Sequence, residues 1–410
     1  MIFTEITKED FRNYLDNHEL KSFLQTPEMA ALKVKDGCSE YYVGVKENGK
    51  IICATMMFSY NTRFGKYFTA PRGYLIDFKD KKLLSFFTDN IKKYIKMRGG
   101  YVLNIEPKIL YKERDIDGKI VEGGFDNSDI YNNLILLGYK HGGFYEHLDL
   151  NKQVRWAFVL PLEGKTKEEI FNGFKANTRN IIRKNQKIGV RVKELERNQL
   201  DVFTQLVESS GSRKNFHSRT TDYYKNMYDL FHSKGEVKFL VTELNMGEYK
   251  NYLYLEKDEL EKKITSIKNA KSSVGKKNEY ISQIETLEKK IKEAEQLQID
   301  FGDNPIMAGA MFMLYGNEIV YLFSGTRSEF MTLKSQYLLQ WNMIEFGIEN
   351  GYKLHNFYGI NGNLKEEDDR FGLYTFKKSF NGQVIEYIGD FDLIINKFAY
   401  YIKKIISKIR

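Results

Sequence analysis

Residues 246–300 constrain the fold of this chain most, because they have the composition of a long, charged helical hairpin. This stretch contains no proline, and its eleven lysines are balanced by eleven acidic residues. Its apolar residues recur at heptad spacing in each half. They are Leu253, Leu260, Ile264, Ile267 and Val274 in the first half, and Tyr280, Ile284, Leu287, Ile291 and Ala294 in the second. Because Ser272–Asn278 contains residues that end one helix and begin another, we predict an antiparallel coiled-coil arm that projects roughly 30 Å.

Outside this arm the chain is basic. The net charge is +8, from 63 basic and 55 acidic residues, and the arm contributes none of it because eleven minus eleven is zero. A basic body attracts polyanions such as nucleic acid, phosphorylated precursors or an anionic membrane surface. The charge alone does not choose among these partners.

Cysteine and histidine are too few and too scattered to predict a metal site. The two cysteines are Cys38 and Cys53, and the six histidines show no ligand spacing. We expect no metal, no bound cofactor and a reducing compartment. Residues 1–5 contain neither a basic n-region nor an apolar run, so we expect no secretory signal and a cytoplasmic location.

The C-terminal segment is amphipathic. Its apolar residues share one helical face and are Phe398, Tyr401, Ile402, Ile405, Ile406 and Ile409. The basic residues around that face are Lys403, Lys404, Lys408 and Arg410. A helix of this kind either docks on the core or rests peripherally on the acidic inner surface of a membrane, and the sequence leaves both open.

The remaining sequence alternates helical and β-rich patterns, which predicts a mixed α/β fold. A hairpin signal at Asn48–Gly49 is followed by a helix that ends at Gly99–Gly100 and then by a strand. A hairpin at Tyr315–Asn317 and a helix that ends before Gly351 repeat this order. We therefore predict two similar α/β units.

The expected boundaries follow from these patterns. The first unit is predicted over 1–150, and the second over 151–245 together with 302–387. The arm, 246–301, interrupts the second unit. A single basic helix is predicted over 167–187.

Signatures of several enzyme classes are missing. The sequence has no nucleophile elbow, no Walker loop and no zinc-protease helix motif. A coenzyme A acyltransferase would need a Gln/Arg-x-x-Gly-x-Gly/Ala loop that holds pyrophosphate on backbone amides. The nearest match, Gln186–Arg191, lacks the final small residue. A thioester donor is therefore disfavoured.

Four short motifs occur in a characteristic order along the chain. They are Phe23–Met29, Asn177–Lys184, Arg219–Tyr224 and Gly372–Phe380. With these motifs and the arm, the chain resembles, over nearly its whole length, the Fem (FemABX) family of non-ribosomal peptidyl transferases, which add amino acids from aminoacyl-tRNA to the peptidoglycan stem peptide. The resemblance implies two tandem domains similar to the GCN5-type acetyltransferase fold, with the segment 388–410 packing back on the first.

The resemblance also implies a binding site for a peptidoglycan precursor. Lys33 lies eight residues after Gln25, where the family has a lysine that contacts the precursor phosphates, although Lys35 competes for this role. Arg219 and Tyr223 match the family's Arg-x-x-x-Tyr pair, in which a guanidinium group grips phosphate oxygens. The alternatives are a solvent-exposed lysine and an arginine without a ligand at the start of a helix.

Tyr101 and Glu106 match a tyrosine and a carboxylate that line the precursor pocket in the family. The family example has aspartate where this chain has Glu106. A carboxylate at this position would orient or deprotonate the attacking amine. In the alternative interpretation, Glu106 and Pro107 only shape a turn.

Phe376 and Lys377 match the Phe-Lys pair that the family uses at the 3′ end of the tRNA. When an amine attacks an aminoacyl ester, negative charge grows on the carbonyl oxygen and then on the departing ribose oxygen, and an ammonium group stabilises both. Phe376 would stack on the terminal adenine. In the alternative, Phe376 and Phe380 are core residues while Lys377 and Lys378 face solvent.

Further tRNA contacts are expected on the predicted basic helix. Arg179, Arg183 and Lys184 would face tRNA phosphates, or water in the alternative. The arm also suits a long partner such as tRNA, although not every relative carries one. A dimerisation coil or a spacer is the alternative function of the arm.

The resemblance therefore implies an aminoacyltransferase that moves an amino acid from aminoacyl-tRNA to the stem-peptide amine of a lipid-linked or UDP-linked peptidoglycan precursor. Because the aminoacyl ester is already activated, the reaction requires no metal or cofactor. Two other classes stay open. One is a coenzyme A-dependent N-acyltransferase, and the other is a non-catalytic adaptor whose arm recruits tRNA or protein.

Overall fold

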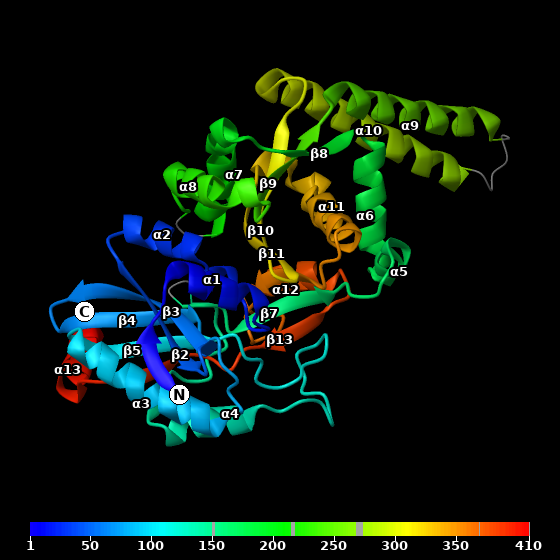
Figure 1. The fold of residues 1–410 in the computed structure, drawn as a ribbon. Coiled ribbons are helices and arrows are strands. Elements are labelled where there is room, and N and C mark those ends of the chain that lie inside the picture. Colours follow the sequence, from blue (N-terminus) through cyan, green and yellow to red (C-terminus); the bar gives the residue numbers. More distant parts are fainter. Residues whose placement is uncertain (150–151, 215–217, 268–273, 369, 410) are drawn as a thin grey trace. The chain divides into compact units, whose positions relative to one another are not determined.

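The computed structural model describes residues 1–149, 152–214, 218–267, 274–368 and 370–409. Helices and strands alternate along the chain in a mixed α/β fold (Figure 1). The chain forms two compact units. The first consists of Met1–Pro161, Met313–Val320 and Tyr352–Arg410, and the second of Leu162–Phe312 and Tyr321–Gly351.

The first seven-stranded sheet belongs to the first unit. Its strand order is β1-β2-β3-β4-β5-β14-β6. The strands are β1 (Ile2–Glu5), β2 (Ser39–Glu47), β3 (Lys50–Thr62), β4 (Gly65–Arg72), β5 (Gly100–Pro107), β6 (Tyr139–His141) and β14 (Phe391–Ile394). β4 and β5 are parallel, and the other neighbours are antiparallel. β14 comes late in the chain yet lies between β5 and β6.

Helix α3 (Lys81–Met97) packs on one face of this sheet. It begins after Asp80, whose side chain accepts a hydrogen bond from the backbone N of Leu83 at 2.9 Å. Leu84, Phe87, Ile91 and Ile95 recur at helical spacing and are wholly buried. They share one core with apolar side chains of the strands. Each such side chain contributes roughly 1.5–3 kcal/mol, so this core is the main source of stability in the first unit.

The other helices of the first unit are α1 (Lys8–Asn17), α2 (Pro27–Lys35), α4 (Ser128–Leu136), α12 (Phe371–Lys378) and α13 (Lys397–Ile409). α2 begins at a proline, whose fixed φ suits the first turn of a helix. Thr26, just before it, accepts a hydrogen bond from the backbone N of Met29. α13 packs through Ala399 and Tyr400 against the start of β5.

The second sheet also has seven strands, in the order β13-β7-β12-β11-β10-β9-β8. They are β7 (Trp156–Pro161), β8 (Val190–Glu194), β9 (Val237–Leu244), β10 (Ile306–Tyr315), β11 (Glu318–Thr326), β12 (Leu354–Gly359) and β13 (Gln383–Glu386). β11 and β12 are parallel, whereas β7 is antiparallel to both β12 and β13. The compact units do not follow the two sheets one to one, so the boundaries expected from the sequence stay a prediction.

The helices of the second unit outside the arm are α5 (Lys167–Gly173), α6 (Ala176–Lys187), α7 (Leu200–Lys214), α8 (Thr221–Phe231) and α11 (Gln336–Glu349). The prediction of one helix over 167–187 is wrong, because the chain is extended at Phe174. Phe174 is buried, with its ring against that of Trp341. A tertiary contact next to Gly173, a poor helix former, overrides the helical pattern. Short 3₁₀ helices lie at Phe23–Gln25, Arg197–Gln199, His232–Lys234 and Ser328–Leu333.

The arm consists of two helices that lie side by side (Figure 1). They are α9 (Met246–Ser266) and α10 (Val274–Phe301). Lys257 forms an ion pair with Glu288 at 2.7 Å, and the Tyr254 hydroxyl donates to Glu295 at 3.4 Å. The residue earlier in α9 contacts the residue later in α10, so the two helices are antiparallel, as predicted.

Burial identifies the seam of the arm. Leu253, Ile291 and Ala294 are buried, the other seam positions from Leu260 to Ile267 and from Tyr280 to Leu287 are half-buried, and their polar neighbours are exposed. The placement of Val274 on the first helix is wrong, because Val274 begins α10 and is 55% exposed. The predicted turn lies partly outside the described residues.

No helix within the described ranges combines the length and the apolar character that crossing a bilayer requires.

Candidate active site

Lys377, the predicted catalytic cation, lies in the last turn of α12 and is 3% exposed. Its Nζ donates hydrogen bonds to the carbonyl oxygens of Tyr358 at 3.1 Å and Gly359 at 2.7 Å. The alternative in which Lys377 faces solvent is therefore wrong. An ammonium group taken out of water needs such acceptors, because burial without them is costly.

An irregularity at the end of β12 turns these two carbonyl groups toward Lys377. The pairing of β12 with β7 shifts between Asn356 and Gly359, and Tyr358 has φ of +65°. The Asn356 side chain accepts a hydrogen bond from the backbone N of Tyr358 at 2.8 Å, which stabilises the unusual conformation. A Cβ atom at Gly359 would lie 2.7 Å from Val154 and 2.8 Å from Leu148, so a larger residue there would force these side chains to shift.

Glu106 lies near the end of β5 and is 8% exposed. Its Oε1 accepts a hydrogen bond from the backbone N of Gln153 at 2.8 Å. Burial raises the pKa of this carboxyl above its ordinary value, against the lowering effects of the Gln153 hydrogen bond and of Arg72. A buried carboxylate with a raised pKa is a stronger base than one in water, which suits proton transfer.

A chain of hydrogen bonds connects Glu106 to Lys377. The Tyr358 hydroxyl donates to the side-chain oxygen of Gln153 at 3.2 Å. The backbone N of Gln153 donates to Glu106, and the backbone carbonyl oxygen of Tyr358 accepts from Lys377. The structure thus brings two predicted catalytic residues into one network. Gln153 and Tyr358 escaped the sequence analysis because neither belongs to a motif and 205 positions separate them.

Mixed charges surround Glu106. Lys152 donates to the buried carboxylate of Asp390 at 3.0 and 3.2 Å, and Asn104 donates to it at 3.5 Å. The buried guanidinium of Arg72 lies over the ring of Tyr387, 3.8 Å from its centre, and donates to a backbone carbonyl. Motif reasoning did not identify these groups.

Phe376 precedes Lys377 on α12 and is half-buried. Its ring packs edge-on against that of the wholly buried Phe380, with centres 5.5 Å apart. Lys378, on the other side of Lys377, forms an ion pair with Asp117. Of the two neighbouring lysines, Lys377 is the one that α12 directs into the protein.

Tyr101 and Glu106 are not brought together. They lie near opposite ends of β5, and five residues of strand span about 16 Å. Tyr101 is 1% exposed and packs against Tyr67. Within the described part of the chain its hydroxyl has no hydrogen-bond partner.

Lys33, the predicted phosphate ligand, lies in the last turn of α2. Its side chain is 32% exposed, and its Nζ is 3.8 Å from a carboxylate oxygen of Asp36. That long ion pair at the surface is worth little, so the ammonium group of Lys33 is accessible to an anionic ligand.

Arg219 and Tyr223, in the second unit, are brought together. The guanidinium of Arg219 lies over the Tyr223 ring, 5.3 Å from its centre, and Arg219 is exposed. Thr220 caps α8 and accepts a hydrogen bond from the backbone N of Tyr223, which fixes the backbone position of Tyr223. Arg219 and Tyr223 thus place a guanidinium group and a phenol group at the N-terminus of one helix.

The three residues predicted to contact tRNA differ in what they do. Arg179 donates to the carbonyl oxygens of Asn172, at 2.8 Å, and Phe174, and so ties the end of α5 to α6. Arg183 is exposed, with its guanidinium 5.1 Å from the centre of the Phe171 ring. Partial burial and the neighbouring Lys290 lower the pKa of Lys184. Arg183 and Lys184 are thus exposed cations, whereas Arg179 is tied to the protein.

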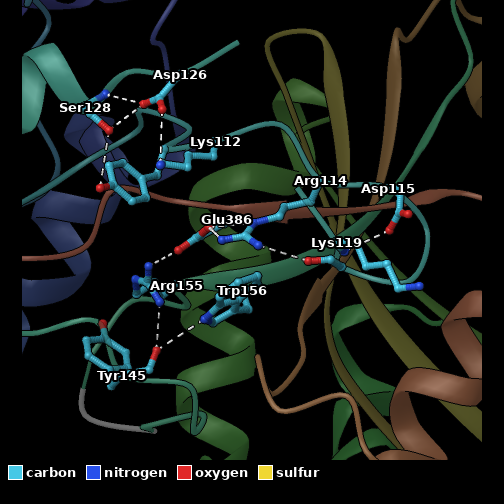
Figure 2. Close-up of polar contacts among 12 residues, drawn as sticks. Lys112, Arg114, Asp115, Lys119, Asp126, Ser128, Tyr145, Arg155, Trp156 and Glu386 are labelled. Atoms are coloured by element: carbon cyan, nitrogen blue, oxygen red, sulfur yellow. Dashed lines mark hydrogen bonds and ion pairs between the residues drawn. The ribbon is translucent and has the colours of Figure 1, made fainter. Parts of the chain in front are cut away.

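A second buried polar cluster centres on Glu386 of β13 (Figure 2). Its carboxylate forms ion pairs with Arg155 and with Arg114, whose Nε donates at 2.8 Å. Arg155 and the indole of Trp156 both donate to the carbonyl oxygen of Tyr145. Burial lowers the pKa of Arg155 despite the adjacent carboxylate. The cluster holds the segments around residues 114, 145, 155 and 386 together.

No group of three or more histidine, cysteine, aspartate and glutamate side chains suited to a metal ion occurs in the part of the chain that the structure describes.

Comparison with known proteins identifies relatives over the full length. The model of the FemAB family matches residues 6–408. The aminoacyltransferase FemA of Staphylococcus epidermidis is 31% identical, with 100% of both chains covered. FemA of Staphylococcus aureus is 31% identical, with 100% of this chain and 99% of the relative covered. The crystal structure of FemX has a TM-score of 0.77 at 25% identity and covers 98% of this chain and 99% of its own.

A more distant structure bears on the fold alone. A tandem GNAT protein from the clavulanic acid biosynthesis pathway has a TM-score of 0.50 at 8% identity, with 96% of this chain and 98% of that chain covered. The prediction of tandem acetyltransferase-like domains is confirmed. This architecture places the chain in the class of tandem GNAT-like folds. Within that class, the chain belongs to the FemAB family and is an aminoacyltransferase.

Proposed function

We propose that this enzyme transfers an amino acid from aminoacyl-tRNA to the stem-peptide amine of a peptidoglycan precursor, lipid-linked or UDP-linked, and so builds the interpeptide bridge. The single observation that carries the proposal is the buried ammonium group of Lys377, held by two carbonyl oxygens and connected to Glu106 through Tyr358 and Gln153. Membership of the FemAB family supports the same reaction class. The enzyme works in the cytoplasm, with peripheral contact at the membrane.

In the proposed reaction the amine attacks the carbonyl carbon of the aminoacyl ester. The bond between that carbon and the ribose oxygen breaks and an amide forms. The amine loses one proton in this step, and the ribose oxygen takes up one proton and becomes the free hydroxyl of the tRNA. Negative charge develops first on the carbonyl oxygen and then on the ribose oxygen, and the ammonium group of Lys377 offsets it. A fixed cation needs little reorganisation during the reaction, which supports this role for a lysine held by backbone carbonyls.

Glu106 accepts the proton that the amine loses. Its raised pKa supports this role, because a base works best when its pKa approaches the working pH. Phe376 lies beside Lys377 in α12 and supplies a ring for stacking on the terminal adenine.

Four residues are proposed to bind the precursor. Lys33, Arg219 and Tyr223 bind its phosphates, since an accessible ammonium group and an exposed guanidinium group suit anionic oxygens. Tyr101 contacts another part of the precursor. It is almost fully buried, so exposure supports its role less than it supports the roles of the other three residues.

The tRNA is proposed to contact Arg179, Arg183 and Lys184. The exposed positions of Arg183 and Lys184 support contacts with phosphates. The carbonyl contacts of Arg179 support a role in holding the end of α5 in place for such contacts.

The test is direct transfer. The enzyme is incubated with charged tRNA pools and with a lipid-linked or a UDP-linked precursor, and the mass increment of the precursor is measured. An increment that depends on the tRNA supports the proposal and names the amino acid. Transfer from an acyl thioester without tRNA would establish a coenzyme A-dependent enzyme instead, and no transfer from any donor would leave an adaptor.

Replacing Lys377 with methionine tests its role in this reaction. We expect Lys377→Met to lower kcat by on the order of 100-fold or more, with the KM for the precursor little changed, because the lost interaction belongs to the transition state. Lys378→Met is the matched control on the same helix and should retain turnover. Unchanged kcat in Lys377→Met would refute the assignment.

A further inference from the structure

Helix α13 has one face packed on the protein. Ala399 and Tyr400 are 8% and 3% exposed and pack against Tyr101 and Val102 of β5. The Tyr400 hydroxyl donates to the carboxylate of Asp392 on β14 at 2.7 Å. These contacts fix the orientation of α13 about its own axis.

The opposite face of α13 presents large apolar side chains to the outside. Phe398, Tyr401 and Ile405 are 77%, 46% and 60% exposed. Their spacing of three and then four residues places them on one stripe of the helix. Met97, at the end of α3, is 76% exposed. Single exposed apolar residues are ordinary on protein surfaces, but a stripe of three along one helix marks an interaction surface.

A pocket of about 520 Å³ lies beside this stripe. Its lining includes Phe64, Lys96 at the end of α3, and Lys397 and Phe398 at the start of α13. Lys96 and Lys397 are both exposed, so two lysines line the pocket together with the ring of Phe398.

The charged side chains of α13 itself are all basic. Lys404 is exposed, and Lys403 lies over the rings of Tyr67 and Tyr101. The α13 sequence contains no acidic residue. A second copy of this face would place lysines against lysines, which disfavours self-association. A nucleic acid would match the charge but would not bury an aliphatic side chain such as Ile405.

We propose that this face of α13 rests on an anionic phospholipid bilayer. Phe398, Tyr401 and Ile405 enter the interfacial region, while Lys397 and Lys404 lie at the level of the phosphates. The pocket beside Phe398 receives one phosphate headgroup between Lys96 and Lys397. This inference rests on the membrane contact in the proposed function and names the surface that makes it, and it does not depend on which precursor is the acceptor.

The experiment measures binding of the full chain to sedimented vesicles, made either of phosphatidylglycerol mixed with phosphatidylcholine or of phosphatidylcholine alone. We expect binding to the anionic vesicles that weakens as salt is added. The double variant Phe398→Ser with Ile405→Ser should bind at least about tenfold more weakly, because two apolar anchors are lost. Leu136→Ser is the matched control, since Leu136 of α4 is 84% exposed and lies outside this face.

Charge variants test the second part of the inference. Lys397→Gln with Lys404→Gln should weaken vesicle binding by about fivefold per lysine. Lys96→Gln should weaken it by a similar factor, because Lys96 lines the pocket. Equal binding to anionic and neutral vesicles would overturn the role of the charges, and unchanged binding of the serine double variant would overturn the apolar anchor.

Two further measurements separate this inference from folding and from the proposed function. The thermal midpoint of each variant should match that of the parent, since the substituted side chains are exposed. Sedimentation in solution should give the same mass for parent and serine double variant; a parent dimer that the variant lacks would assign the face to self-association and overturn the inference. Failure of amino-acid transfer would not affect either result.

Discussion

The first unit buries two charged side chains in different ways, and the contrast separates a candidate for chemistry from a structural cluster. Lys377 is held by two backbone carbonyl oxygens, whereas Glu386 is held by two guanidinium groups. Carbonyl dipoles fix an ammonium group without neutralising its formal charge. Two arginines more than neutralise one carboxylate. A carboxylate held by two guanidinium groups from separate segments keeps those segments together, whereas the carbonyl contacts of Lys377 come from one strand end.

The largest expected effect comes from breaking the Glu386 cluster. Glu386→Gln should lower the free energy of unfolding by roughly 3–5 kcal/mol, because Arg155 and Arg114 then lose their buried counter-ion. Urea unfolding followed by circular dichroism measures this change. Turnover per folded molecule should stay near the parent value, since the cluster holds segments and takes no part in the reaction.

Asp126→Asn is the matched control for that variant. It removes the charge that pairs with Lys112 at 3.2 Å in an exposed loop of the same region (Figure 2). Surface ion pairs contribute little, so the unfolding midpoint should not move. If Glu386→Gln unfolds at the same urea concentration as the parent, the conclusion that the Glu386 cluster stabilises the fold is wrong.

A second, smaller effect is expected at Glu106. Glu106→Gln keeps an oxygen that accepts the Gln153 hydrogen bond but removes the base, so kcat should fall by about 100-fold. Glu146→Gln, an exposed carboxylate in the segment before Gln153, should leave kcat unchanged. A parent-like kcat in Glu106→Gln would assign proton transfer to another group.

The pH dependence of Glu106 follows from its raised pKa, whose main cause is burial. A base must be ionised, so turnover should fall as the pH drops through this raised value, and the acid limb should vanish in Glu106→Gln. The effect on stability has the opposite sign. The folded carboxyl binds its proton more readily than the unfolded one, so its contribution is present below the unfolded pKa and is lost as the pH rises through the folded pKa.

The smallest effect is expected where the two catalytic residues are connected. Tyr358→Phe removes the hydroxyl that donates to Gln153 and should lower kcat by about fivefold, which corresponds to one hydrogen bond of about 1 kcal/mol. Tyr145→Phe is the control, because its hydroxyl reaches Gln153 only over 3.5 Å. Equal loss in both variants would show that the connection adds nothing to catalysis.

Local patterns in the sequence predicted those parts of the fold that depend on backbone conformation at a turn or on the spacing of apolar residues along a helix. The hairpin at Asn48 and Gly49 forms because both residues accept positive φ, at 48° and 78°. The seam of the arm formed where heptad spacing placed it, apart from Val274, because packing of two helices depends on that spacing alone. Phe174 shows the limit, since a contact with Trp341, distant in sequence, ends a helix that the pattern extended.

The candidate site was predicted in part, from family motifs rather than from local sequence patterns. Lys377 and Glu106 were found through motifs shared with a family, yet neither motif revealed their burial or their connection. That connection depends on Gln153 and Tyr358, which meet only after β12 has paired with β7. The Glu386 cluster joins residues from four separate segments, and no single segment carries a signal of it.

The position of β14 has a consequence for how the protein is made. β6 pairs with β14, which emerges from the ribosome long after β6 and after the entire second unit. The sheet of the first unit therefore stays open between β5 and β6 during most of translation, and nascent chains expose the edges of these two strands throughout that time. Synthesis in the N-to-C direction here completes the first-made unit last, and chaperones that shield strand edges are expected to act on this chain until residues 391–394 have been delivered.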